Sequence, residues 1–450
     1  MLDDLIARYH DLLARDTIAA DSQAHLDQQT AQRQLYFGKR PVCTVLRPRL
    51  LTPQQYALLR QAVHALLPAF AVADRHAASD PAFRQQFCLR DWEETLLEID
   101  PGFTPSYPTS RLDAFYTSEA ELKFTEFNTE TPAGVGYHDV LSEIFQGMPV
   151  VQEFTRRVDL QPLPSRPGVL HALLAAYRQW AGNTSTRPRI AIVDWQHVPT
   201  ASEFTLMADY FRSQGLECRI VDPRDIEWAE GGLRVGDYRF DLIYKRVLIN
   251  ELIQQGGLDH PIIRAVRQRA VCMVNTFGCK PLFKKASFAV LSDERNHALF
   301  TPEQHQAIAR FIPWTRLLQE RHTTYANQTI DLVPWTLANR ERLVLKPNDE
   351  YGGKGIVLGW VIGQTEWERA VTQALTEPTV VQERVNLPRE VFPSYEGGQL
   401  HLLERMLDTD PFVLLGERMH SCLTRISTEA LLNVTAGGGS TVPTFIVHAD

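Results

Sequence analysis

The chain has 450 residues, of which 44% are hydrophobic and 22% charged, proportions typical of a soluble globular protein with roughly two to four structural units. Its net charge of −8, without a run of lysine or arginine, argues against nucleic acid or an anionic membrane as a partner. The six cysteines form no CxxC pair and have no nearby histidine at zinc-ligand spacing, so we expect free thiols and no zinc site.

The first unit is predicted to span residues 1–165. It begins with an amphipathic segment that lacks the apolar core of a signal peptide. We find no run of about 18 apolar residues that would suit a membrane span, so we expect a cytoplasmic protein. Helices near the N-terminus, a strand over residues 41–48 and a helix opened by Thr52 and Pro53 are predicted to follow one another.

Polar side chains in strand-like sequence predict a metal site within this unit. The run KFTEFN is predicted to form a strand, and its Glu126 and Asn128 are two residues apart, so both project from one face. Asp113, on a predicted neighbouring strand, can reach the same place. Oxygen ligands of this kind suit Mg²⁺. The alternative is a solvated strand face that carries a charged pair.

A second unit is predicted over residues 166–275, after a linker marked by Pro162, Pro164 and Pro167. A strand within residues 187–195, a helix and a strand within residues 217–223 form a βαβ pattern of the Rossmann-like kind. No GxGxxG sequence follows the first strand, so we expect no dinucleotide and interpret the unit as the wall of an acceptor pocket.

Two details of this second unit can be tested. Its helix is predicted to begin at a capping box formed by Thr200 and Glu203 and to end at Gly215. Lys245 and Arg246 follow an apolar strand at a point where packing does not need charge, so they are candidates for binding a substrate carboxylate.

Residues 276–330 are predicted to connect this unit to a small α/β lid over residues 331–392. The lid begins with a hairpin whose loop contains Gly352, Gly353 and Gly355, and glycine lets backbone amides approach phosphate oxygens closely. Lys346 and Lys354 supply positive charge beside that loop. The Walker A pattern is absent and no helix follows the glycines, so an exposed hairpin turn is the alternative.

The rest of the lid is predicted to be a helix with a capping box at Thr365 and Glu368, followed by a strand over residues 379–385. Residues 393–450 are predicted to complete the core sheet. Arg425 lies in this closing segment before the glycines at 437–439, and we weigh a role in phosphate stabilisation equally with a surface salt bridge.

These motifs together resemble the circularly permuted branch of the ATP-grasp family, which includes the synthetase half of glutathionylspermidine synthetase. The resemblance rests on Arg-x-Asp at 111–113, Glu-x-Asn at 126–128, a Thr-Pro turn at 131–132 and the GGKG loop at 352–355. It covers most of the chain. The phosphate loop and the lack of an amidase half depart from the spermidine enzyme and put a glutathione or spermidine substrate in doubt.

The resemblance implies an α/β fold with a lid and assigns roles to residues of this chain. It implies that ATP is held by a lid lysine, the glycine loop, a lysine before the lid and a hinge whose backbone contacts adenine. Either Lys284 or Lys285 fits the lysine before the lid, and we favour Lys285. The implied nucleotide contacts are Lys285, Lys346, Gly352, Gly353, Lys354, Gly355, Gln382, Glu383 and Val385; the implied ligands of two Mg²⁺ ions are Asp113, Glu126 and Asn128; Arg111 and Arg425 are implied to stabilise charge during the reaction.

The predicted activity is an ATP- and Mg²⁺-dependent ligation of a carboxylate to an amine through an acyl phosphate. Two alternatives remain open at this point, a small-molecule kinase and a nucleotide-binding protein without turnover. We expect a small-molecule or peptide carboxylate and an amine as substrates, and either a monomer or a small homo-oligomer.

Overall fold

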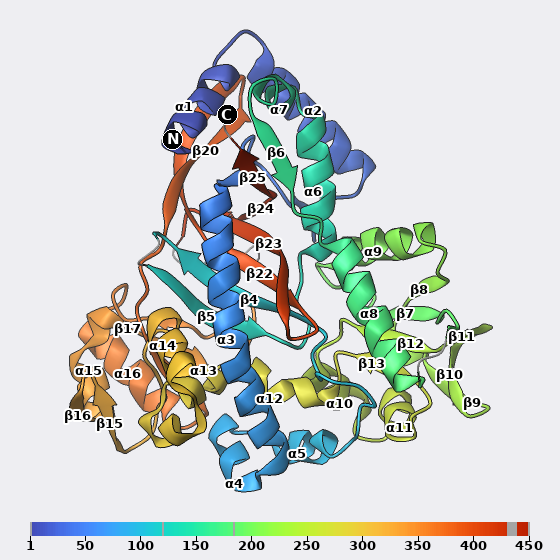
Figure 1. The fold of residues 1–450 in the computed structure, drawn as a ribbon, viewed down its shortest axis with the longest axis vertical. Helices are drawn as coiled ribbons and strands as arrows, with labels where there is room; N and C mark the ends of the chain where they lie inside the picture. Colours follow the sequence, from blue (N-terminus) through green and yellow to red (C-terminus); the bar gives the residue numbers. More distant parts are fainter. Residues whose placement is uncertain (1, 119–120, 183–184, 430–438, 449–450) are drawn as a thin grey trace.

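The computed structural model describes residues 2–118, 121–182, 185–429 and 439–448. At its centre lies an antiparallel sheet with the order β20-β21-β23-β22-β4-β5, in which β24 also pairs with β23 (Figure 1). This sheet therefore joins segments from both ends of the chain. Its strands are β4 (Thr109–Tyr116), β5 (Leu122–Asn128), β20 (Arg389–Glu396), β21 (Gln399–Leu407), β22 (Asp410–Leu414), β23 (Arg418–Ser427) and β24 (Ser440–Val442).

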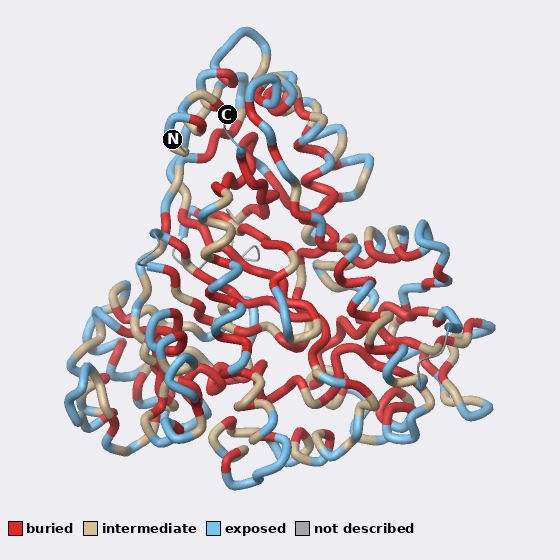
Figure 2. Tube along the Cα trace, viewed as in Figure 1, coloured by how far each residue is buried: buried red, intermediate tan, exposed pale blue. Residues whose placement is uncertain are grey.

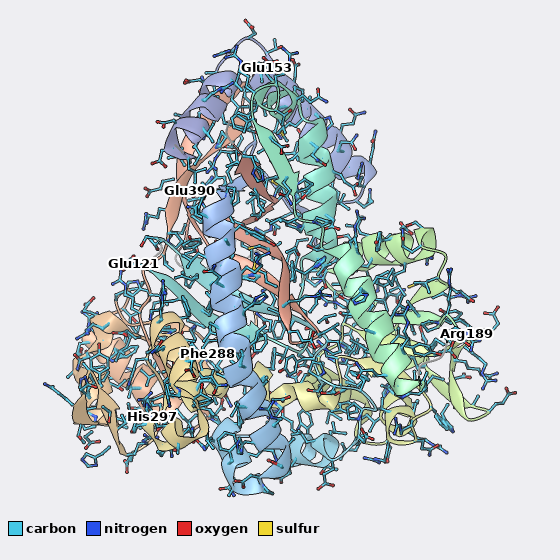
Figure 3. The ribbon with its side chains drawn as sticks, viewed as in Figure 1. Glu121, Glu153, Arg189, Phe288, His297 and Glu390 are labelled. Atoms are coloured by element: carbon cyan, nitrogen blue, oxygen red, sulfur yellow. The ribbon has the colours of Figure 1, made fainter. Side chains whose placement is uncertain are left out.

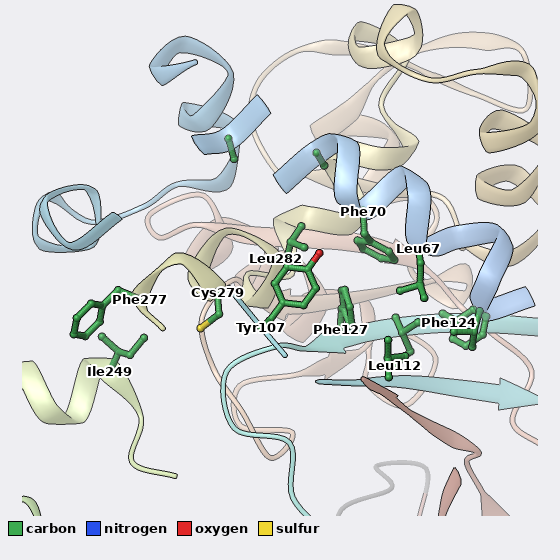
Figure 4. Close-up of a cluster of buried hydrophobic side chains, with 14 of the residues drawn as sticks. Leu67, Phe70, Tyr107, Leu112, Phe124, Phe127, Ile249, Phe277, Cys279 and Leu282 are labelled. Carbon is green, nitrogen blue, oxygen red and sulfur yellow. The ribbon is translucent and has the colours of Figure 1, made fainter. Parts of the chain in front are cut away.

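One long helix, α3 (Pro53–Ser79), covers the central sheet. Thr52 and Gln55 form a capping box at its first turn, which confirms the predicted start of this helix. Leu67 and Phe70 point from α3 toward the strands (Figure 4), and the ring centroids of Phe70 and Phe127 are 4.6 Å apart. The buried side of this helix is therefore part of the main hydrophobic core, which Figure 2 shows as a continuous buried region.

The same helix is long and apolar enough to cross a membrane by length and composition, so the expectation that no segment meets this test was wrong. Leu59, Leu66 and Phe70 of α3 are fully buried against other elements. This packing is that of a core helix in a folded domain.

Helices α1 (Leu2–Leu13), α2 (Ile18–Gln32), α6 (Val135–Gly147) and α7 (Pro149–Phe154) pack at one end of the molecule (Figure 1). Beside them lie the sheet of β3 (Arg49–Leu51), β25 (Thr444–His448) and β6 (Asp159–Pro162) and the hairpin of β1 (Tyr36–Phe37) and β2 (Arg40–Pro41).

The strand predicted over residues 41–48 is wrong, because this segment bonds to several partners and not to one ladder. The amide of Val42 donates to Leu35, and the amide of Leu46 donates to Pro393. The Arg47 guanidinium is buried and forms a 2.8 Å ion pair with Glu390, which Figure 3 labels on β20. The segment is therefore irregular and packs around the buried Arg47 guanidinium, and it lacks the alternating burial of a strand.

The second unit contains a parallel sheet with the order β13-β12-β7-β8. Alternate residues of β7 face opposite sides: Ile190 and Ile192 pack with α8 and α9, whereas Ala191 and Val193 pack with α10 and α11. The bounds are β7 (Ile190–Val193), β8 (Cys218–Val221), β12 (Leu242–Lys245), β13 (Cys272–Val274), α8 (Arg166–Trp180), α9 (Ala201–Ser213), α10 (Ile249–Gly256) and α11 (Pro261–Arg267), with a small sheet of β9 (Glu227–Ala229), β10 (Gly232–Val235) and β11 (Tyr238–Phe240).

The predicted linker before this unit is not observed. Pro162 is the last residue of β6, and Pro167 lies in the first turn of α8, where a proline lacks no needed hydrogen bond. The predicted capping box is also wrong, because Thr200 makes no side-chain cap. Glu203 instead accepts hydrogen bonds from the amides of Gly134 and Gly136, at 2.7 and 3.1 Å, and so caps the start of α6 from another segment.

The lid is a sheet with the order β14-β19-β17-β18, packed on α15 and α16 around the fully buried Trp367. Its α16 begins one residue before Thr365 and has Gly363 as its N-cap without a side-chain bond, so the predicted capping box is wrong. The elements are β14 (Thr315–Leu317), β17 (Leu343–Pro347), β18 (Val357–Leu358), β19 (Thr379–Glu383), α15 (Leu332–Ala338) and α16 (Gln364–Ala374), with the hairpin of β15 (His322–Tyr325) and β16 (Gln328–Asp331).

Short helices connect the lid to α3. Phe288 of α13 lies beside α3 (Figure 3), where its ring centroid is 5.5 Å from that of Phe70. The connecting helices are α12 (Lys280–Phe283), α13 (Ala286–Ser292) and α14 (Pro302–Phe311), and α4 (Pro81–Arg84) and α5 (Asp91–Leu97) follow α3. The lid is thus anchored to the same core that supports β4 and β5.

Candidate functional site

Strands β4 and β5 bring the predicted metal-site residues together. They are antiparallel neighbours in which Asp113 lies opposite Glu126 and Arg111 lies opposite Asn128. Side chains at opposite positions of an antiparallel pair share one face of the sheet. The predicted convergence of these two segments is therefore present in the structure.

A cavity of about 170 Å³ lies between these strands and the lid, and we call it the first cavity. Its walls bring together segments that are far apart in the sequence. Among the residues predicted to form the site, it is lined by Arg111, Asp113, Glu126, Asn128, Lys346, Gly352, Gly353, Gln382, Glu383, Val385 and Arg425.

Lys346 connects the two walls of the first cavity. Its ammonium donates to Oε1 of Gln382 at 2.7 Å and to the carbonyl of Thr125, on β5, at 3.4 Å. Burial lowers the pKa of Lys346 to about 8, and Lys285 adds to this effect, whereas Glu126 and Asp113 oppose it. Lys346 is thus a largely desolvated ammonium group at the wall of the first cavity, where it can interact with an anionic ligand.

The two lysines before the lid have different surroundings. The Lys285 ammonium lies 3.0 Å from Oε1 of Glu126, which lines the first cavity, and donates to the carbonyl of Glu350 at 2.5 Å. Lys285 itself is not among the described residues that line this cavity. Lys284 is 1% exposed at its side chain and forms ion pairs with Glu93 and Asp349. The preference for Lys285 over Lys284 agrees with this arrangement.

Asp349 fixes the beginning of the glycine loop. Its carboxylate lies 2.9 Å from the Lys284 ammonium and accepts a hydrogen bond from Lys280 at 2.7 Å. Lys280 also lies 3.2 Å from Glu130 and 3.4 Å from Glu93. We call Glu93, Glu130, Lys280, Lys284 and Asp349 the buried ion cluster.

The outer part of the loop lies differently from the prediction. The Lys354 side chain is 75% exposed and pairs with Glu350 at 3.3 Å, because three glycines with positive φ turn the chain away from the cavity here. Neither Lys354 nor Gly355 is among the described residues that line the first cavity. Of the loop residues predicted to contact phosphate, Gly352 and Gly353 line that space.

The predicted hinge is partly occupied by the lid sheet itself. The amides of Glu383 and Arg384 donate to the carbonyls of Trp314 and Arg342, so these two amides are not available to an adenine in this conformation. Contact of the other backbone groups of residues 382–385 with adenine stays a prediction. The Glu383 carboxylate accepts a hydrogen bond from the Tyr325 hydroxyl at 2.6 Å. Gln382 is 2% exposed and acts through Lys346.

Two arginines and three aspartates form a buried cluster at the floor of the first cavity. Arg111 donates from Nε and Nη2 to the two oxygens of Asp113, at 2.7 and 2.8 Å. Arg425 donates to Asp113 at 2.8 Å and to Asp408 at 2.7 Å, and it lies 3.0 Å from Asp410. A surface salt bridge is therefore the wrong interpretation of Arg425.

The surroundings set the charges in this cluster. Burial opposes ionisation of Asp113, yet Arg111 and Arg425 outweigh it and lower the pKa of this carboxyl to about 2. Burial raises the pKa of Asp408 and, more strongly, that of Asp410, although Arg425 opposes both shifts. No local sequence pattern marks Asp408 or Asp410, because their partner Arg425 lies on another strand.

The predicted magnesium ligands fit unequally. Glu126 and Asn128 both line the first cavity and both carry a side-chain oxygen, the ligand atom that Mg²⁺ prefers, although Oε1 of Glu126 lies 3.0 Å from the Lys285 ammonium. Both oxygens of Asp113 are instead bonded to arginines, so this carboxylate is not free to bind a metal in the observed arrangement. No group of three or more acidic, histidine or cysteine side chains that could hold a metal occurs among the described residues.

A second cavity of about 410 Å³ adjoins the first, and the two share Arg111, Asn128, Gly352 and Arg425. It extends toward the carboxyl ends of β7 and β12, where ligands bind in open parallel sheets. Its other walls include Phe37, Val42, Pro132, Tyr137, Asp194, Val198, Pro199, Arg246, Leu248, Glu251, Phe283, Tyr351 and Leu423.

Of the two residues predicted to bind a substrate carboxylate, one lines the second cavity and the other does not. Arg246 lines it, and its guanidinium is held by the carbonyl of Pro132 at 2.6 Å. Lys245 is 1% exposed and lies 3.7 Å from Glu130, so it is part of the interior and is not among the described residues of either cavity wall. The prediction was wrong for Lys245 because its strand is buried to its last residue. Of the predicted closing glycines, 437 and 438 lie outside the described residues.

Comparisons with known proteins identify similar chains. No family model matches the sequence. A putative glutamate–cysteine ligase from Frankia casuarinae is 24% identical over 330 residues, which are 70% of this chain and 36% of that protein, so the match spans about a third of the relative's length. A glutathione synthetase-like effector from Globodera pallida, solved in its apo form, matches 96% of this chain and 98% of its own, with a TM-score of 0.57 and 11% identity. D-alanyl-alanine synthetase A from Vibrio cholerae aligns over 58% of this chain and 74% of its own at 13% identity, with a TM-score of 0.26, too low to indicate a shared fold.

The similarity to the effector extends over nearly the full length of both chains and therefore concerns the whole mixed α/β architecture.

Proposed function

We propose that this chain is an ATP- and Mg²⁺-dependent carboxylate–amine ligase with a circularly permuted ATP-grasp fold. One observation carries the proposal: Lys346 of the lid donates a hydrogen bond to Thr125 of β5, 221 positions earlier in the chain, beside Glu126. A phosphate-binding lysine and a metal-site strand that meet in one cavity have no shared role in packing. The similar proteins support the reaction class, because one is a putative glutamate–cysteine ligase and the other a glutathione synthetase-like effector.

In this proposal the triphosphate lies in the first cavity. Lys346 and Lys285 supply positive charge to the phosphates, and the amides of Gly352 and Gly353 lie beside them. Mg²⁺, when bound, neutralises phosphate charge, and Glu126 and Asn128 are the residues that would hold it. Arg111 and Arg425 lie at the border with the second cavity, where transferred phosphate and substrate would meet.

The reaction proceeds in two balanced steps. A substrate carboxylate oxygen attacks the γ-phosphorus, and the bond from the γ-phosphorus to the β–γ bridging oxygen breaks. The products of this step are ADP and an acyl phosphate. The neutral amine then attacks the acyl carbon, and the bond from that carbon to the phosphate oxygen breaks. The departing phosphate takes up the proton that the nitrogen loses, so the products are an amide and inorganic phosphate. The arginines stabilise the negative charge in both steps, and a closed cavity keeps water from the acyl phosphate. No nucleophilic side chain of the protein is needed.

The experiment is a screen of amino acids and short peptides, alone and in pairs, for Mg²⁺-dependent release of ADP. The ligase is supported when release requires both a carboxylate and an amine and when mass spectrometry finds the amide. Release with the carboxylate alone, with an accumulated phosphorylated product, identifies a kinase instead. Nucleotide binding without turnover for every pair would refute both enzymes.

The matched variant for this screen is Glu126→Gln, which keeps size and hydrogen-bonding capacity but removes one charge from the proposed metal site. Asp209→Asn is the control. This substitution also removes one negative charge, but Asp209 is exposed on α9 and is not among the described residues that line either cavity.

A further inference from the structure

Two carboxylates that line the second cavity have no ion-pair partner among the residues that the structure describes. Asp194 directly follows β7, and Glu251 lies in the first turn of α10. Trp195 fixes both, because its amide donates to Oδ1 of Asp194 at 2.8 Å and its indole donates to Oε2 of Glu251 at 2.9 Å. The tryptophan therefore holds the two carboxylates next to each other at the cavity wall.

Each carboxylate keeps an oxygen available to a ligand. Asp194 is 8% exposed, and its Oδ2 accepts no hydrogen bond among the described residues. Oε1 of Glu251 accepts only a long hydrogen bond, 3.3 Å, from the exposed Tyr351. Neither carboxylate forms an ion pair with a lysine or arginine in the part of the chain that the structure describes. A buried, unpaired carboxylate is costly unless a cation binds it.

Positive charge is found on other walls of the same cavity. Arg246 is held by Pro132 and lies 3.8 Å from Glu203. Arg111 and Arg425, which are paired with the aspartates of the buried cluster, form the border with the first cavity. A ligand that satisfies both regions carries an ammonium group and a carboxylate in one molecule. Its carboxylate would then lie at the border, where the proposed phosphoryl transfer takes place.

On the basis of the proposed function, we infer that the second cavity binds the substrate to be activated as a zwitterion, an amino acid or short peptide with a free ammonium group, and that Asp194 and Glu251 are the counter-ions of that ammonium. Charge-assisted hydrogen bonds to a carboxylate hold the group in its protonated form. This ammonium is therefore the recognition group, and the attacking amine is a second, neutral molecule.

A dependence on pH follows from the same geometry. Burial, with a smaller contribution from Glu251, raises the pKa of Asp194 to about 6. The hydrogen bond from the Trp195 amide and the charges of Arg246 and Lys245 oppose this shift. Only the ionised carboxylate pairs with an ammonium. Substrate binding is therefore strongest above this pKa and weakens as the pH falls through about 6.

The test uses the full chain and three forms of each amino acid or dipeptide: the free form, the N-acetyl form and the des-amino acid. Binding is measured by calorimetry without nucleotide, and KM is measured from ADP release. The variants are Asp194→Asn and Glu251→Gln. Asp237→Asn is the control, because it removes a charge from an exposed loop of the same unit, where the side chain is 87% exposed.

We expect the free form to bind at least tenfold more tightly than the N-acetyl and des-amino forms. Each variant should raise Kd and KM for the free form by roughly 10- to 100-fold, the change expected when one charge-assisted hydrogen bond is lost. The affinity for ATP should stay unchanged. The variants should leave the weak binding of the N-acetyl form almost unchanged, and Asp194→Asn should remove the loss of affinity below about pH 6.

Equal binding of the free and N-acetyl forms, or unchanged values in both variants, overturns the inference even when ADP release continues, so that the proposed function survives. Ammonium-dependent binding that the variants abolish, in an enzyme that releases no ADP, supports the inference and refutes the proposed function. A lack of binding for every form at millimolar concentration also overturns it.

Discussion

Lys346→Met is the sharpest test of the first cavity, because methionine keeps the length of the side chain and removes only the ammonium. That ammonium makes hydrogen bonds at 2.7 and 3.4 Å in the absence of nucleotide. A hydrogen bond from a charged group contributes about 1.5–3 kcal/mol, so the dissociation constant for ATP should rise roughly 10- to 100-fold.

The same substitution should change the free energy of unfolding much less. Oε1 of Gln382 loses its donor in a side chain that is 2% exposed, which costs about 1–3 kcal/mol, but removal of a desolvated ammonium offsets part of this cost. Nucleotide affinity is measured by calorimetry and stability by urea unfolding. Lys39→Met, at an exposed lysine in another part of the molecule, is the matched control.

A pH profile separates a direct role from a structural one. Burial lowers the pKa of Lys346 to about 8, so the free protein carries this charge below pH 8 and loses it above. ATP binding favours the charged form, and affinity should therefore fall as the pH rises through about 8, whereas Lys346→Met should lack this step. Wild-type ATP affinity in a folded Lys346→Met protein would refute the assignment of the first cavity to phosphate.

Three further outcomes are expected. Glu126→Gln should keep the fold and nucleotide binding but abolish Mg²⁺-dependent ADP formation in a coupled assay, and full activity would remove Glu126 from the metal site. Gln382→Leu should weaken ATP binding several-fold in calorimetry and move the loss of affinity to lower pH, because the Lys346 ammonium loses its acceptor; a structural role alone would leave that midpoint in place. Trp367→Ala should destabilise the lid by about 3–5 kcal/mol in urea unfolding, since the indole is fully buried; a loss below 1 kcal/mol would contradict the described packing.

Local sequence patterns were enough to predict the strands that carry the candidate site. Two residues of separation between Glu126 and Asn128 fixed their common face, and β5 was observed where the alternation predicted it. The hairpin of β17 and β18 was equally clear, because turn residues separate two apolar strands. The location of Lys346 in the same cavity depended on the family resemblance, since no local pattern connects segments so far apart.

The features that the sequence did not predict depend on contacts between residues that are far apart in the chain. Glu203 was expected to cap its own helix, yet it caps α6, because two buried amides there offer stronger partners than one exposed helix end. Asp408 lies in the connection between β21 and β22, and Asp410 begins β22; only the approach of Arg425 and β4 gives them a role. Asp194 and Glu251 likewise have nothing in common until β7 and α10 fold together.

The buried ion cluster has a consequence for how the glycine loop can vary in length. Lys280 and Lys284 fix Asp349 from below, whereas Gly352, Gly353 and Gly355 adopt positive φ on the outer side. The hairpin therefore has one end that is anchored in the interior and one that is free to change its path. A change of length at the exposed turn around Lys354 would leave these buried ion pairs in place. The same change before Asp349 would pull a carboxylate away from two buried ammonium groups, at a cost few folds could absorb.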